Sequence, residues 1–210
     1  MAENSKTYFS TDGSIPTVLS KAYSGPFTVD TTTVITARSF DANGNASLPV
    51  AAYFRIASSK ENHGVRVKYF PGDGWNHMPA FSILQSTHAW NSYEFSLNRE
   101  QILPLFGKDS STFGCTLEGY LQIDQPGNYS FYIRSDDGSK LYVDNKELVN
   151  NDGDHGVIEK NGSVDLAPGR HLIKVEYYNG SGGFWLDAFY KGPGIPKQII
   201  PANKLYLSAN

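Results

Sequence analysis

The 210-residue sequence has a single cysteine, Cys115, and this scarcity excludes a framework of internal disulfides. The cysteine lies in an alternating apolar run with Phe113 and Leu117. Such a run is typical of a strand whose thiol packs in the core and behaves as a small apolar group. A catalytic nucleophile is the less favoured alternative for this residue.

Charge of either sign is also scarce and evenly spread. The chain has 18 Lys and Arg against 21 Asp and Glu, a net charge of −3, with no charged block. The electrostatic footprint of a protein that binds nucleic acid or an anionic membrane is therefore missing. No apolar run approaches the ~18 residues of a membrane span, so we expect no membrane insertion. Residues 1–4 show no basic and apolar leader, so no signal peptide is visible in this chain.

The sequence has almost no helical periodicity of apolar residues, and most of its segments show the alternation that is typical of strands. The only helical candidate spans residues 98–106, where Pro104 limits it to about two turns. Elsewhere apolar and polar residues alternate between turns rich in Gly, Pro, Asn and Asp, which predicts an all-β sandwich or barrel. The clearest strand candidates are residues 33–40, 65–70, 92–97, 112–124, 129–134, 140–144, 163–166, 171–178 and 184–190.

The strand candidates divide into two groups separated by a polar stretch. Residues 58–64 lack both hydrophobic periodicity and turn signals, so we predict one domain at 1–57 and a second at 58–210. The first group has few strands for an independent fold. We therefore expect it to be a truncated domain that lacks one or two initial strands.

Residues 131–144 of the second group read FYIRSDDGSKLYVD, and this stretch resembles the signature of the PA14 domain. The resemblance implies an antiparallel β-sandwich that is commonly attached to carbohydrate-active enzymes or lectin-like surface proteins. It covers about residues 64–207 in the family's order, and its flanking matches are residues 118–121, 126–129, 152–156, 168–171, 175–178 and 200–206.

In the first group, residues 8–17, 23–26 and 34–41 carry a second similarity. They resemble the chitobiase/hexosaminidase C-terminal type of domain, a small Ig-like module. Together, the two resemblances imply the C-terminal region of a bacterial glycoside hydrolase. They imply an extracytoplasmic location, whether periplasmic, cell-surface or secreted. They also imply two partners, a glycan and a catalytic domain of the same polypeptide.

Asp136 and Asp137 are the leading candidates for metal ligands. Adjacent carboxylates concentrate negative charge, and Ca²⁺ takes 6–8 oxygen ligands. In the adhesin branch of the family that this sequence resembles, an aspartate pair joined by a cis peptide holds Ca²⁺, which then coordinates sugar hydroxyls. The alternative is an ordinary hairpin turn, because Asp-Asp-Gly-Ser between two alternating strands has that composition.

Further oxygen donors crowd the neighbouring loops. Asn150, Asn151, Asp152 and Asp154 fall in one loop and Asn179 begins another. The resemblance implies that these loops gather at one end of the sandwich, where Asn151, Asp152 and Asn179 would contact sugar. Turn chemistry alone is the alternative for all of them. His155 is a candidate for binding sugar or metal, with a hydrogen bond that braces the loop as the alternative.

The sequence departs from the family at two places in these loops. Where many relatives attached to glycosidases have Asp-Asn-Trp, residues 149–152 read Val-Asn-Asn-Asp, which removes one stacking surface. The second calcium loop of the adhesin branch is also hard to align on residues 179–183. Both departures bear on how the metal and the sugar would be held.

Sugar binding also needs an aromatic face, which the tryptophans could supply. Trp75 follows a Pro-Gly-Asp-Gly loop and is expected to be exposed, and Trp185 stands beside Phe184 so that one of the two faces outward. Trp90 is a further candidate. Core packing is the alternative for each, because tryptophan is usually mostly buried.

The sequence disfavours catalysis by this chain itself. No Gly-x-Ser-x-Gly elbow, phosphate loop or dinucleotide fingerprint is present. Glu118 and Glu176 could form a hydrolytic pair only at the required separation, and each is explained as the polar face of a strand. We therefore expect a non-catalytic carbohydrate-binding accessory module of a glycoside hydrolase or surface glycan-utilisation protein. The alternatives are a structural spacer and a loop that borders a neighbouring active site.

Overall fold

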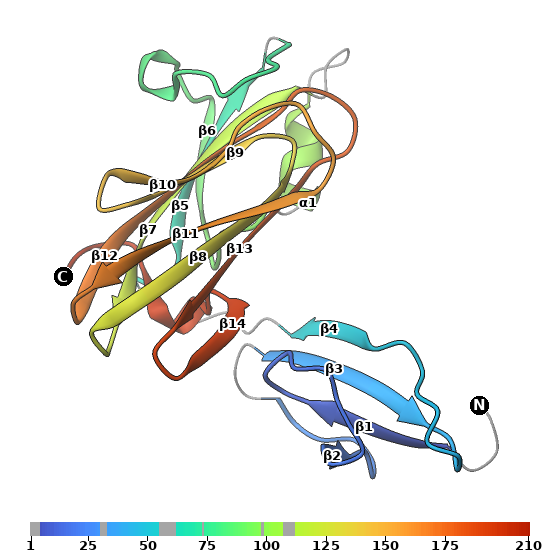
Figure 1. Ribbon diagram of the computed structural model, residues 1–210. Helices are drawn as coiled ribbons and strands as arrows, with labels where there is room; N and C mark the ends of the chain where they lie inside the picture. Colours follow the sequence, from blue (N-terminus) through green and yellow to red (C-terminus); the bar gives the residue numbers. More distant parts are fainter. Residues whose placement is uncertain (1–4, 30–32, 55–61, 73, 98, 107–111) are drawn as a thin grey trace.

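The computed structural model describes residues 5–29, 33–54, 62–72, 74–97, 99–106 and 112–210, and these form three antiparallel sheets (Figure 1). The all-β prediction is therefore confirmed. Helix in the described ranges is confined to α1 (Arg99–Ile102) and three 3₁₀ turns, η1 (Phe81–Ile83), η2 (Leu103–Leu105) and η3 (Ala202–Lys204). None of these helices has the length and hydrophobicity that crossing a bilayer requires.

The first sheet is built from residues 6–54 in the order β2-β1-β3-β4. The alternating β-branched run forms its longest strand, as predicted. Phe9 and Thr36 are buried, whereas the edge strand β4 is exposed throughout. The predicted domain boundary at residue 57 lies outside the described residues and stays a prediction. The strands are β1 (Lys6–Ser10), β2 (Lys21–Ala22), β3 (Thr33–Phe40) and β4 (Val50–Phe54).

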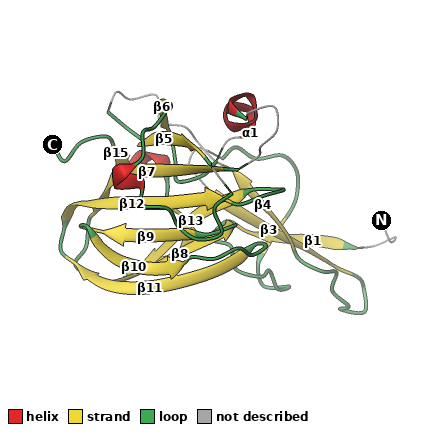
Figure 2. Cartoon of the chain, turned by 90° about the horizontal axis from the view of Figure 1, so that it is seen from above, coloured by secondary structure: helices red, strands yellow, loops and turns green. Residues whose placement is uncertain are grey.

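The other two sheets pack face to face as a sandwich (Figure 2). One has the order β10-β9-β12-β7-β5-β6, with β15 paired to β7, and the other has the order β11-β8-β13-β14. The strands of the first are β5 (Val65–Pro71), β6 (His88–Ser92), β7 (Phe113–Ile123), β9 (Ser139–Val143), β10 (Lys146–Asn151), β12 (Gly169–Asn179) and β15 (Leu205–Tyr206). Those of the second are β8 (Gly127–Asp136), β11 (Ile158–Leu166), β13 (Trp185–Gly192) and β14 (Ile195–Ile199).

One apolar core fills the space between these two sheets. Its side chains alternate along the central strands, and Leu117 and Cys115 on β7 belong to the same buried cluster as Phe131 and Ile133 on β8. Complete burial raises the pKa of the Cys115 thiol, so little thiolate forms. The prediction of a buried cysteine in the core is confirmed.

The structure corrects one predicted strand and adds others. A strand was expected at 92–97, but the observed strand, β6, ends at Ser92, the residue that pairs with Val65. The chain then crosses to the other sheet, where Ser96 bridges to Asp187 and Phe95 enters the core. The strands β10 and β14, and the first half of β11, were not expected. All three are edge strands of polar sequence, defined by pairing with a neighbour and not by apolar alternation.

Candidate functional site

The Asp136–Ser139 turn is the centre of the candidate site, and it is not a hairpin. It leaves β8, which pairs with β11 and β13, and enters β9, which pairs with β10 and β12. The turn therefore carries the chain from one sheet of the sandwich to the other, and the hairpin alternative is wrong. The peptide bond between Asp136 and Asp137 is cis.

Glycine at position 138 is required by close packing. A Cβ there would lie 2.3 Å from Cε1 of the Tyr178 ring and 3.1 Å from the main chain of Gly153. Tyr178 comes from the end of β12 and is fully buried. The small residue thus lets the turn, β12 and the loop after β10 meet at one point.

The Asp137 carboxylate joins two loops. It is 3% exposed, its Oδ1 accepts the main-chain N–H of His155 at 3.1 Å, and its Oδ2 accepts the N–H of Gly180 at 2.8 Å. Each bond involves an ionised acceptor, which is the stronger type of hydrogen bond. The structure therefore brings the loops after β10 and after β12 together at the aspartate pair.

Negative charge accumulates beside Asp137. Asp154 lies within hydrogen-bonding range of Asp137, and this contact and the charge of Asp137 raise the pKa of the Asp154 carboxyl. Partial burial, together with the charge of Asp154, raises the pKa of Asp136, while the nearby His155 opposes the rise. Asp137 thus disfavours ionisation of Asp154, and Asp154 disfavours ionisation of Asp136.

Asn179 stands behind the aspartate pair at the end of β12. It is fully buried, and its Oδ1 lies 3.4 Å from the hydroxyl of Tyr177. That hydroxyl donates to the main-chain oxygen of Asp136 at 2.5 Å. The amide oxygen of Asn179 is therefore held close to the turn.

The chemistry of these donors suits a hard cation. Ca²⁺ accepts carboxylate, amide and main-chain oxygens, and Asp136, Asp137, Asp154 and Asn179 supply the first two kinds. Within the described ranges, no three His, Cys, Asp or Glu side chains are already arranged as a metal site. A calcium ion here would therefore depend on amide, main-chain or ligand oxygens in addition to the carboxylates.

Asn151, Asp152 and His155 brace this region. Asn151 ends β10 fully buried, and its Nδ2 donates to Oγ of Ser135 at 3.0 Å and to the main chain of Ile158 at 3.2 Å. Contrary to the expectation of a sugar contact, its side chain does not reach solvent. Asp152 accepts the N–H of Met78 at 2.7 Å and so anchors the loop that contains Trp75.

His155 matches the alternative of a bracing residue. Its Nδ1 lies 2.8 Å from the main-chain oxygen of Gly156, and its Nε2 lies 3.0 Å from that of Asn151. Both ring nitrogens thus face main-chain oxygens of its own loop. The side chain fixes the loop in which Asp154 sits.

The tryptophans are placed differently from one another. Trp185 begins β13 opposite Asp136 and is 48% exposed, with its Nε1 donating to Asp187 at 2.8 Å. Trp75 was expected to be exposed, but it is half-buried and packs edge-to-face on Phe81. Trp90 packs against the core. Trp185 is thus the tryptophan that presents an apolar face beside the aspartate pair.

Tyr178 is a member of the site that the sequence did not single out. Its hydroxyl is buried with no hydrogen-bond partner in the described part of the chain. Burial and the charges of Asp152, Asp137 and Asp154 raise the pKa of this phenol. Strand alternation would send Tyr177 and Tyr178 to opposite faces, yet both are buried because the turn covers Tyr178.

Glu118 and Glu176 lie on the outer face of β7 and β12. They line a separate groove of about 360 Å³. Glu176 accepts the hydroxyl of Tyr142 at 2.9 Å and pairs with Lys174 at 2.8 Å. These contacts fit the polar face of a strand.

Comparison with known proteins identifies both parts of the chain. Residues 62–204 match the PA14 domain family, and residues 2–51 match the family described as chitobiase/beta-hexosaminidase C-terminal domain. Among curated proteins, the anti-sigma-I factor RsgI3 of Acetivibrio thermocellus is 29% identical over 103 residues, 49% of this chain. The match spans only 16% of that relative's length.

Two solved structures share the fold. The PA14 sugar-binding domain from an RTX adhesin aligns with a TM-score of 0.59 at 19% identity, over 70% of this chain and 99% of that one. An anti-sigma factor domain-containing protein from Clostridium clariflavum aligns with a TM-score of 0.57 at 17% identity, over 97% of this chain and 80% of that one. The second alignment includes the small N-terminal sheet as well as the sandwich.

Proposed function

This chain belongs to the PA14 domain family, and from that premise we propose that it is a non-catalytic carbohydrate-binding module whose recognition end is the Asp136–Asp137 turn. The observation that carries the proposal is the position of Asp137. Its carboxylate ties together two loops at the end of the sandwich, with other carboxyl groups crowded beside it. An exposed indole, that of Trp185, adjoins the same turn.

Calcium is part of this proposal. Asp136, Asp137, Asp154 and Asn179 would hold the ion, which when bound supplies positive charge and open coordination positions for sugar hydroxyls. Asp137 would keep the two loops in place around it. The Trp185 ring would pack against the apolar C–H face of a sugar, the role that amphipathic aromatic rings play in binding sites.

Calorimetry and a glycan array test the proposal. We expect the wild-type chain to bind Ca²⁺ and to bind neutral glycans at least tenfold more tightly with Ca²⁺ than with a chelator. The variant Asp137→Asn removes a charge without changing shape and should lose both activities. Asp165→Asn, an exposed aspartate on β11 that accepts from Asn128 at 3.0 Å, is the matched control and should behave as wild type. Wild-type chain that binds no glycan on a broad array would disprove the proposed function.

The parent protein has two candidate classes. An accessory role in a glycoside hydrolase, outside the cytoplasm, is supported by the match of residues 2–51 to a family named after such enzymes. A regulatory role, in which glycan binding is the signal, is supported by the similarity to the anti-sigma-I factor RsgI3. The two classes differ in which domain shares the polypeptide, a hydrolase or a sigma-factor-binding segment.

Deleting the module from the parent protein separates the remaining roles. If the module is accessory, its deletion should lower activity on insoluble polysaccharide and leave activity on a soluble substrate unchanged. If it is a spacer, its deletion should lower the stability of the protein and leave kcat/KM unchanged. If one of its loops borders the active site, its deletion should selectively lower kcat/KM for a soluble substrate.

A further inference from the structure

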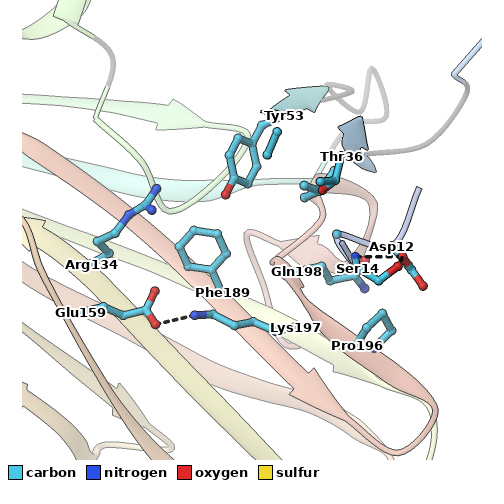
Figure 3. Close-up of a pocket in the computed structure, with 13 residues that line it drawn as sticks. Asp12, Ser14, Thr36, Tyr53, Arg134, Glu159, Phe189, Pro196, Lys197 and Gln198 are labelled. Atoms are coloured by element: carbon cyan, nitrogen blue, oxygen red, sulfur yellow. Dashed lines mark hydrogen bonds and ion pairs between the residues drawn. The ribbon is translucent and has the colours of Figure 1, made fainter. Parts of the chain in front are cut away.

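A groove lies between the small N-terminal sheet and the outer face of the sheet β11-β8-β13-β14 (Figure 3). The two parts meet where β14 approaches β3 and where the Tyr53 ring contacts Phe189 edge-on at 6.3 Å. The groove holds about 400 Å³, within the usual range for a small-ligand site, and such sites favour domain interfaces. Its lining includes Tyr53 from the N-terminal sheet and Arg134, Glu159, Phe189, Lys197 and Gln198 from the sandwich.

The floor of the groove alternates cations and aromatic rings. Phe189 is buried, with the Arg134 guanidinium 5.2 Å and the Lys197 ammonium 5.3 Å from its ring centre. Tyr53, from β4, remains 42% exposed above this floor. Tyr53 is thus the ring in the groove that can stack on a ligand (Figure 3).

The charges of the floor are already paired. Arg134 donates to Asp187 at 2.8 Å, and Lys197 pairs with Glu159. An anionic ligand would have to compete with these carboxylates for both cations. A neutral, hydroxyl-rich ligand can use the paired groups as they stand, because carboxylates and the Gln198 amide accept or donate hydrogen bonds to hydroxyls.

The strand register connects this groove with the Asp136–Asp137 turn. Arg134 and Asp136 share the outer face of β8. Their partners on the neighbouring strand β13 are Asp187 and Trp185, respectively. Trp185 and Phe189 are four residues apart on one strand, roughly 13 Å along it. One continuous outer face thus leads from the exposed indole to the groove.

We propose that this groove is a second subsite for a neutral glycan chain, which takes the units beyond those held at the Asp136–Asp137 turn. The inference rests on the proposed function. It adds that affinity grows with chain length, that charged glycans gain nothing from the groove, and that the N-terminal sheet contributes a ligand contact through Tyr53.

The test compares short and long glycans on one array. The probes are neutral disaccharides and hexasaccharides of the β-glucan, xylan, mannan and chitin series, with hexagalacturonate as the charged probe. We expect Tyr53→Ala to weaken hexasaccharide binding about tenfold, the loss typical of an important aromatic contact, and to leave disaccharide binding unchanged. Tyr53→Phe keeps the ring and should stay within about twofold of wild type. Tyr93→Ala, at a tyrosine that is 54% exposed away from the groove, is the matched control.

The outcomes separate this inference from the proposed function. Equal hexasaccharide binding by wild type and Tyr53→Ala would overturn the subsite and leave the calcium-end site intact. Tighter binding of hexagalacturonate than of every neutral hexasaccharide would overturn its neutral assignment. A wild-type chain that binds no probe would overturn both proposals. Gln198→Ala, on the opposite wall, provides a second variant if Tyr53→Ala unfolds at a lower temperature, and it should also weaken only the hexasaccharides.

Discussion

At the scale of single residues, the site depends on side chains that never reach a ligand. Asn151 and His155 hold the loop after β10, and Gly138 lets three segments converge under the Tyr178 ring. These residues position Asp137 while remaining buried or engaged themselves. A search for exposed polar side chains would therefore miss most of the residues that position this end of the sandwich.

Gly138 offers a direct test of this packing. Gly138→Ala would place a methyl group 2.3 Å from the Tyr178 ring, so we expect a loss of about 1–3 kcal/mol in the free energy of unfolding. Denaturation in urea measures the change. Gly156→Ala, in the neighbouring loop with open space around its Cβ, is the control and should change stability by less than about 0.5 kcal/mol. Equal stability of the two variants would show that the turn can shift at no cost.

At the scale of elements, β8 and β13 are joined by more than their ladder. The Arg134–Asp187 pair crosses between them, Trp185 donates to the same Asp187 oxygen, and the Asp187 side chain is only 6% exposed. Removing one member of a largely buried pair leaves the other without its partner, which is far costlier than losing a surface pair.

Asp187→Asn should therefore destabilise the chain by about 2–4 kcal/mol in urea denaturation. Asp124→Asn is the matched control, because Asp124 pairs with Lys204 at 2.5 Å while 60% exposed. We expect that control to cost less than about 1 kcal/mol. If both variants lose the same amount, the Arg134–Asp187 pair does not stabilise the pairing of β8 with β13.

The same scale shows what the sequence could predict. Alternation located the central strands, such as 112–124 and 171–178, because one face of each is buried. It missed β10, since residues 146–151 contain two asparagines that read as a loop, although pairing with β9 makes them a strand. The Asp136–Ser139 turn was located correctly, but the hairpin alternative for it is wrong, because which strands pair is decided by contacts distant in sequence.

Burial within the candidate site was also beyond the sequence. Asn151 and Asn179 have the composition of exposed turns, yet both are fully buried by segments that fold over them. Trp185 could be placed beside its strand start, but its position opposite Asp136 depends on the register between β13 and β8. The apolar alternation of a strand fixes which of its faces is buried, but a shift in register by two residues keeps that face, so the partner of Trp185 cannot be read from either strand alone.

At the scale of the whole molecule, the two parts differ in how they are stabilised. All members of the main core cluster lie between Val65 and Leu205. The small sheet keeps an open apolar groove of about 420 Å³ along Phe9, Phe27 and Phe54. Folding of the sandwich should therefore not require the small sheet.

A chain of residues 62–210 tests this independence. We expect it to unfold cooperatively within a few degrees of the full chain, as measured by differential scanning calorimetry, because its core is intact. It should also keep calcium-dependent disaccharide binding and lose the additional affinity for hexasaccharides. A shortened chain that fails to fold would show that the small sheet stabilises the sandwich across the interface at β14.

The Asp137 carboxylate has one further consequence, for hydrogen exchange. The amide protons of His155 and Gly180, on loops that follow different strands, both donate to it. Any opening that withdraws this carboxylate exposes both protons to solvent in the same event. Two loops distant in sequence therefore behave as one cooperative unit, and occupancy of the turn by a cation or sugar would slow exchange at both amides together.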